Sequence, residues 1–174
     1  MINVPAVYLL HGKGGSPNGT VAKLQECLQQ DWRELKYIRP ALPHGDPTVR
    51  AEVSVEFLHN LPLETGSLVI GVSLGGLVAA KLQEKSRPDL YVICISSPTW
   101  ADGVKLLRRA EHRVAFYSVV DEVISDRIGN WPRLAEVYEF PWLDHDTDRH
   151  LEPLTRLISS YLRGDLSLSV RDCS

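Results

Sequence analysis

The stretch Ser67-Leu68-Val69-Ile70-Gly71-Val72-Ser73-Leu74-Gly75-Gly76 decides how the rest of this sequence is interpreted. It opens with a short apolar run, Ser67–Ile70, of the kind that forms a buried strand. Apolar residues then recur at helical spacing through Leu74–Glu84. The pentapeptide Gly71–Gly75 lies between the two, so it predicts a tight strand-to-helix turn with Ser73 at its tip.

A serine at such a turn is a candidate nucleophile. Small residues two positions before and after it allow the strand and the helix to approach closely. The N-terminus of the helix then directs amide N–H groups toward any negative charge that develops. The alternative is a turn softened by glycine in which the serine has no chemical role. The pentapeptide alone arises by chance in roughly one chain in twenty of this length, so the choice needs other residues.

A serine nucleophile needs a histidine base and an acid that orients the histidine. At a turn of this kind, the acid is expected after a later strand and the histidine after the last strand. Asp121 ends the apolar strand Arg113–Val120, and His145 follows the strand Ala135–Phe140. The sequence therefore predicts Ser73, Asp121 and His145 as the catalytic residues.

Each of these residues has competitors. Glu122 is adjacent to Asp121 but points elsewhere, while Asp102 and Asp126 occupy poorer positions along the chain. His150 is the alternative base, because it lies five residues beyond His145 and close to a helix start. A loop histidine directly after the strand reaches the edge of the sheet more easily, so His145 is favoured and His150 stays open.

The loop after the first strand, His11-Gly12-Lys13-Gly14-Gly15-Ser16-Pro17-Asn18, is rich in glycine. The backbone N–H groups of Lys13 and Leu74 are predicted to form an oxyanion hole. A nucleotide loop is excluded, because Pro17 stands where a dinucleotide fingerprint needs glycine and no Gly-Lys-Ser/Thr follows.

The acidic run Asp144–His150 resembles a calcium loop. Its sixth position is Arg149 instead of glycine, however, and its twelfth is Thr155 instead of glutamate. We therefore expect neither a metal nor another cofactor.

The whole chain alternates short apolar runs with amphipathic helical patterns, which predicts one α/β domain of three layers with a parallel sheet. The expected domain covers residues 1–163, and residues 164–174 are expected to form a tail. Six strands are predicted, at Val4–Leu10, Leu35–Arg39, Ser67–Ile70, Leu90–Ser96, Arg113–Val120 and Ala135–Phe140. Helices are predicted after a cap at Asn18, after a cap at Asp46 with Pro47 first in the helix, at Leu74–Glu84, at Val104–Arg109 and around Leu154–Leu162.

Composition limits the class of protein further. The chain has 174 residues, 44% hydrophobic and 24% charged, with a formal net charge of −3. These values are typical of a globular protein and make a nucleic-acid partner improbable. Three widely spaced cysteines favour a reducing compartment, and no signal-peptide pattern is present. The sequence also has no long apolar stretch, so we expect a cytoplasmic protein without a membrane span.

The motifs Leu9–Gly12, Gly71–Gly76, Val119–Asp121 and Asp144-His145 together resemble the α/β-hydrolase superfamily. The segments around Asp121 and His145 are most similar to small lidless serine hydrolases, of the retinoblastoma-binding-protein type and among the short bacterial esterases. This resemblance implies a six-stranded sheet in the order 2-1-3-4-5-6. It also implies that Ser73 attacks an acyl carbon while His145 takes its proton and Asp121 holds the imidazole.

The sequence departs from larger members of that superfamily, because it begins at the strand with the His-Gly loop and residues 97–113 are too few for a substantial cap. We therefore expect an open site for small carboxylic esters or thioesters with short acyl chains. The alternative is a catalytically idle domain that binds a protein partner. The expected pocket residues are His11, Gly12, His44, Trp100 and Trp142, and the oligomeric state cannot be read from the sequence.

Overall fold

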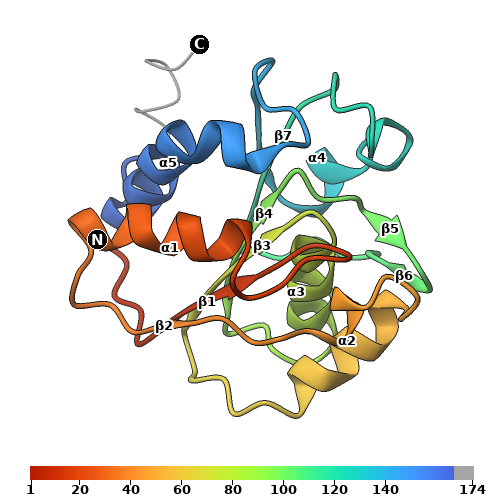
Figure 1. Ribbon diagram of the computed structural model, residues 1–174, viewed down its shortest axis with the longest axis horizontal. Coiled ribbons are helices and arrows are strands. Elements are labelled where there is room, and N and C mark those ends of the chain that lie inside the picture. The colour runs from red at the N-terminus through yellow and green to blue at the C-terminus, as the bar shows by residue number, and fades with distance from the viewer. Residues whose placement is uncertain (167–174) are drawn as a thin grey trace.

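The computed structural model describes residues 1–166 and consists of a parallel sheet between two helical layers (Figure 1). Six strands pair in parallel in the order β2-β1-β3-β4-β7-β8. Numbered along the sheet alone, this is the expected order 2-1-3-4-5-6, so the predicted fold class is confirmed. The strands are β1 (Val7–Leu10), β2 (Tyr37–Ile38), β3 (Leu68–Val72), β4 (Tyr91–Ile95), β7 (Arg113–Tyr117) and β8 (Glu136–Glu139).

The helices divide between the two faces of the sheet. Figure 1 shows α1 beside α5, and α3 beside α2. Their bounds are α1 (Thr20–Asp31), α2 (Ala51–His59), α3 (Leu74–Lys85), α4 (Trp131–Leu134) and α5 (Leu151–Arg163). Short 3₁₀ turns occur at Pro43–Gly45, Ser125–Arg127 and Thr147–His150. Within residues 1–166 the structure contains no helix long and apolar enough to cross a bilayer.

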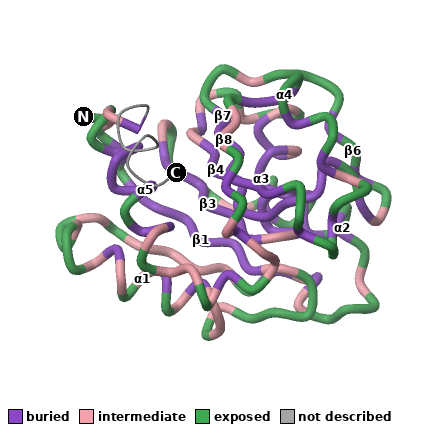
Figure 2. The backbone as a smooth tube through the Cα atoms, turned by 90° about the horizontal axis from the view of Figure 1, so that it is seen from above, coloured by how far each residue is buried: buried purple, intermediate pink, exposed green. Residues whose placement is uncertain are grey.

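Two hydrophobic clusters, one on each face, hold the layers together. Successive residues of a strand point to opposite faces, so Val7 and Leu9 join the cluster under α1 and α5. Tyr8 and Leu10 join the cluster under α2 and α3. This two-sided burial explains why the central strands are continuously apolar, and Figure 2 shows them buried in the middle of the molecule.

Several predicted boundaries are wrong. Residues 104–109 do not form a helix, because β6 (Val104–Lys105) pairs antiparallel with β5 (Trp100–Ala101). The residue that precedes the first helix is Gly19 instead of the predicted cap Asn18, and the second helix begins at Ala51, beyond the Asp46-Pro47 start. The strand β7 ends at Tyr117, so Asp121 lies in the loop that follows it.

The predicted domain boundary at residue 163 remains a prediction. The helix α5 ends at Arg163, and Gly164 follows with a positive φ of 83°. Of the predicted tail, residues 167–174 lie outside the described residues.

Candidate active site

Ser73 occupies the turn between β3 and α3 in a backbone conformation that few residues adopt. Its φ is 52° and its ψ is −123°, a combination that costs about 1–3 kcal/mol for a residue other than glycine. The flanking glycines make the turn possible. A Cβ on Gly71 would lie 2.3 Å from the backbone of Gly75, and one on Gly75 would lie 2.4 Å from the Leu10 oxygen. The glycines therefore allow strand, turn and helix to pack in contact.

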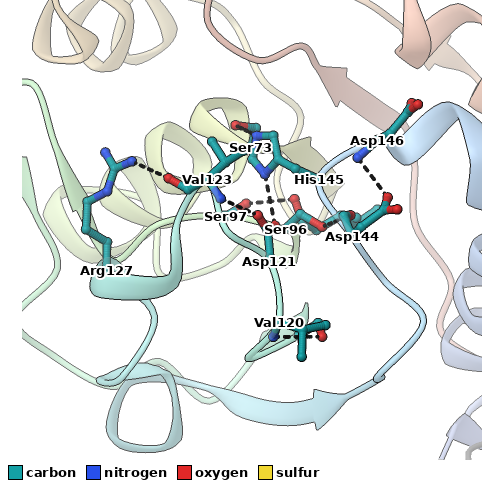
Figure 3. A network of polar contacts seen from close by, with 12 residues as sticks. Ser73, Ser96, Ser97, Val120, Asp121, Val123, Arg127, Asp144, His145 and Asp146 are labelled. Carbon is teal, nitrogen blue, oxygen red and sulfur yellow. Dashed lines mark hydrogen bonds and ion pairs between the residues drawn. The ribbon is translucent and has the colours of Figure 1, made fainter.

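Ser73, His145 and Asp121 form a continuous hydrogen-bonded series (Figure 3). The distance from Ser73 Oγ to His145 Nε2 is 3.0 Å, and that from His145 Nδ1 to Asp121 Oδ2 is 2.9 Å. Asp121 is buried, and its other oxygen accepts the Val123 amide N–H at 3.1 Å. The structure thus brings together the serine, histidine and aspartate that the sequence singled out.

His150, the alternative base, points to a different partner. Its Nε2 lies 2.9 Å from Asp144 Oδ1, and its ring packs against Trp142. The hydrogen bond from His150 holds the pKa of Asp144 below its usual value. His145 is therefore the histidine that the structure places against Ser73.

The loop that carries His145 is tied to the sheet by Ser96, at the end of β4. Ser96 Oγ lies 3.3 Å from the carbonyl oxygen of Asp144, to which it donates. Ser96 also adopts a positive φ, 48°, and its amide donates to Phe116 at 2.9 Å. No sequence pattern marked this residue, because its contact joins segments 48 residues apart.

The glycine-rich loop passes directly over Ser73. A Cβ on Gly12 would lie 3.2 Å from the Ser73 Cβ. Lys13 and Leu74, the predicted oxyanion-hole residues, both line the same cavity of about 760 Å³ as Ser73 and His145. Leu74 is the first residue of α3, so its N–H has no partner within the helix. The structure therefore places both predicted residues on the wall of the cavity that contains Ser73.

The predicted pocket residues separate into two groups. His11 and Gly12 line the cavity. His44 does not, because it is fully buried behind the loop and bonds to His11 and Ser54. Neither Trp100 nor Trp142 lines it either: Trp100 is exposed on β5 with Arg127 over its ring, and Trp142 packs between Phe140 and His150.

The structure adds cavity residues that the sequence did not predict for the pocket. They come from the loop after β7, from the β5–β6 hairpin and from the loop around His145, and include Val123, Ile124, Arg127, Ala101, Asp102 and Asp146. Across the mouth of the cavity, Lys13 Nζ pairs with Asp102 Oδ2 at 2.5 Å. The described residues contain no cluster of three or more His, Cys, Asp or Glu side chains suited to a metal ion.

Comparison with known proteins gives one family and many structures of the same fold. The family described as Uncharacterised protein family (UPF0227) matches residues 6–93, which include the glycine-rich loop and Ser73. No curated protein matches the sequence.

Three solved structures illustrate the likeness. Alpha/beta hydrolase domain-containing protein 10 from mouse has a TM-score of 0.73 and 12% identity over 94% of this chain and 92% of that one. The ydeN gene product from B. subtilis has a TM-score of 0.70 and 17% identity over 92% and 100%. XC6422 from Xanthomonas campestris, described as an α/β serine hydrolase without lid, has a TM-score of 0.60 and 17% identity over 93% and 83%. At these identities the likeness shows the α/β-hydrolase fold.

Proposed function

Because this chain belongs to the uncharacterised protein family UPF0227 and has the fold of lidless α/β-hydrolases, we propose that it is a serine hydrolase of carboxylic esters or thioesters. The observation that carries the proposal is the series Ser73–His145–Asp121, with two hydrogen bonds of 3.0 and 2.9 Å. A strained serine at a strand-to-helix turn, bonded to a histidine that an aspartate orients, is the arrangement that activates a serine hydroxyl.

In the proposed reaction, the Ser73 hydroxyl attacks the acyl carbon while His145 Nε2 takes its proton. Asp121 accepts the hydrogen bond from His145 Nδ1–H, so the unprotonated nitrogen faces Ser73. His145 then returns the proton to the departing alcohol or thiol. A water molecule, deprotonated by His145, attacks the acyl-enzyme and releases the acid.

The oxyanion formed in each attack would be held by the amides of Lys13 and Leu74. Each amide belongs to a segment whose position is fixed close to Ser73, one in the loop and one at the start of α3. Such donors act mainly on the transition state, and the loss of one costs about 10²–10³ in kcat in a characterised serine hydrolase.

The test is active-site labelling with a fluorophosphonate together with turnover of p-nitrophenyl acetate. We expect wild type to be labelled and Ser73→Ala to lose labelling and at least about 10⁴-fold in kcat. Ser86→Ala, an exposed serine after α3, serves as the matched control and should behave as wild type. Undiminished labelling of Ser73→Ala, or an unlabelled and inactive wild type, would reject the proposal in favour of a domain without catalytic activity.

A further inference from the structure

His44 is fully buried, yet it lies outside the series Ser73–His145–Asp121 and outside the wall of the cavity. It belongs to the 3₁₀ turn Pro43–Gly45, which packs behind the glycine-rich loop. A Cβ on Gly45 would lie 2.9 Å from the Gly15 oxygen, so the two segments are in direct contact.

The hydrogen bonds of His44 define which ring nitrogen carries the proton. Ser54 Oγ accepts the His44 backbone N–H at 3.1 Å and lies 2.8 Å from Nδ1. A carbonyl oxygen can only accept, and that of His11 faces Nε2, so the ring proton is on Nε2 and Nδ1 accepts the Ser54 hydroxyl hydrogen. Nε2–H then donates to the carbonyl oxygen of His11 at 2.8 Å. Ser54, on α2, thus holds the imidazole in the orientation in which Nε2–H donates to the loop.

His44 is hydrogen-bonded to the loop on both sides of Lys13. His44 holds the His11 carbonyl through its ring, and its own carbonyl accepts the Gly14 N–H at 3.0 Å. Between these points, the carbonyl of Gly12 accepts from His11 Nδ1 at 2.9 Å and from the Gly15 amide at 3.1 Å.

The direction of the Lys13 amide follows from these bonds. The peptide between Gly12 and Lys13 is planar and trans, so its N–H points opposite to its C=O. With the Gly12 carbonyl held by His11 and Gly15, the Lys13 N–H is directed away from them. The amide donates the hydrogen bond proposed for the oxyanion, so its direction matters for the reaction.

We propose that His44 is a positioning residue for the reaction. With Ser54 behind it, His44 anchors His11 and Gly14 so that the Lys13 amide faces the oxyanion. This inference rests on the proposed function. A residue with this role affects the transition state more than the ground state, so its loss lowers kcat while KM changes little.

Two substitutions of similar polarity separate this role from a structural one. In His44→Gln, the side-chain amide reaches the position of Nε2 and can still donate to the His11 carbonyl. In His44→Asn, the amide reaches only the position of Nδ1, so it keeps Ser54 and loses His11. His59→Asn provides the control, because His59 is exposed and lies at the end of α2.

Turnover of p-nitrophenyl acetate by purified full-length variants is the measurement. We expect His44→Asn to lose about 10- to 100-fold in kcat with KM within about twofold, since misorienting a donor costs less than the 10²–10³ for removing one. His44→Gln should recover to within about threefold of wild type, and His59→Asn should equal wild type. If His44→Asn does not fold, Ser54→Ala provides a second test, because it removes the hydrogen bond to Nδ1 of the His44 ring. This variant should lose about 3- to 10-fold in kcat, since one hydrogen bond is worth about 1 kcal/mol.

The two proposals fail in different ways. An inactive wild type would remove the proposed function itself. An active wild type would overturn the inference alone if His44→Asn and Ser54→Ala kept full kcat. Equal losses in the Asn and Gln variants, or a loss confined to KM, would likewise overturn it.

Discussion

At the scale of single residues, strain is concentrated around the site. Within residues 1–166, three residues other than glycine have a positive φ: Ser73, Ser96 and Asp102. Ser73 carries the proposed nucleophile, Ser96 supports the loop of His145, and Asp102 lies at the mouth of the cavity. Such conformations persist only where the surroundings fix them, and they concentrate at functional sites. Two of them line the cavity and the third bonds to the loop that carries His145, which supports the assignment of this cavity as the active site.

The burial of His44 also leads to a prediction about how the free energy of unfolding depends on pH. Burial lowers the pKa of this histidine from its ordinary value of 6.5. As the pH falls below 6.5, the unfolded chain takes up a proton that the folded chain does not, so the free energy of unfolding decreases. The slope reaches about 1.4 kcal/mol per pH unit until the folded pKa is passed.

We expect this loss of stability between pH 7 and pH 5 to be smaller in His44→Gln, which has no group to titrate. Urea unfolding of both proteins at several pH values measures the difference. His59→Asn, which removes an exposed histidine, should keep the wild-type pH dependence. Parallel curves for wild type and His44→Gln would contradict the prediction.

The candidate site was predictable where chain order determines it. Ser73, Asp121 and His145 follow β3, β7 and β8, and parallel strands bring their carboxyl ends to one edge of the sheet. His44 and Ser96 were missed in these roles because their function depends on bonds to segments 33 and 48 residues away. Nothing in the spacing of residues shows such a bond before the fold is formed.

At the scale of elements, the hairpin β5–β6 shows why one predicted helix is wrong. A short helix was predicted at Val104–Arg109, but the pair Asp102-Gly103 precedes this segment. Both residues have a positive φ, 47° and 84°, as a two-residue type I′ hairpin turn requires, and Asp-Gly is among its preferred pairs. The turn signal therefore outweighs the short helical pattern. The central strands were predictable because their burial on both faces leaves continuous apolar runs, whereas the order of the strands was implied by the resemblance to the α/β-hydrolases.

The turn leads to a prediction for two substitutions of Asp102. Asparagine tolerates a positive φ as aspartate does, whereas alanine in that conformation costs about 1–2 kcal/mol. Asp102→Asn also removes the ion pair with Lys13. The side chains of Lys13 and Asp102 are 42% and 30% exposed, so this ion pair contributes little to stability.

We therefore expect Asp102→Asn to unfold within about 0.5 kcal/mol of wild type and Asp102→Ala to lose about 1 kcal/mol or more. Denaturant unfolding in low and high salt measures both effects. If Asp102→Asn lost as much stability as Asp102→Ala, and salt removed the loss, the ion pair and not the turn would explain Asp102.

At the scale of the whole molecule, little covers the site. Between β4 and β7 the chain forms only the short hairpin β5–β6, and between β7 and β8 it forms a loop with the small helix α4 (Figure 1). Side chains from both segments, Ala101 and Ile124 among them, reach the cavity wall. Neither segment forms a lid, so a substrate group longer than the cavity extends into solvent.

This openness predicts a preference for short acyl chains. A methylene group that becomes buried contributes about 0.8 kcal/mol, or roughly fourfold in kcat/KM, whereas one that stays in water contributes nothing. Across p-nitrophenyl esters from acetate to palmitate, we expect kcat/KM to rise over the first few carbons and then to level off or fall. The series should be measured below the micelle concentration of each ester, so that aggregation does not imitate a loss of activity. A steady rise to palmitate would mean that the chain is buried along its length, which requires a cover over the cavity that residues 1–166 do not form in this structure.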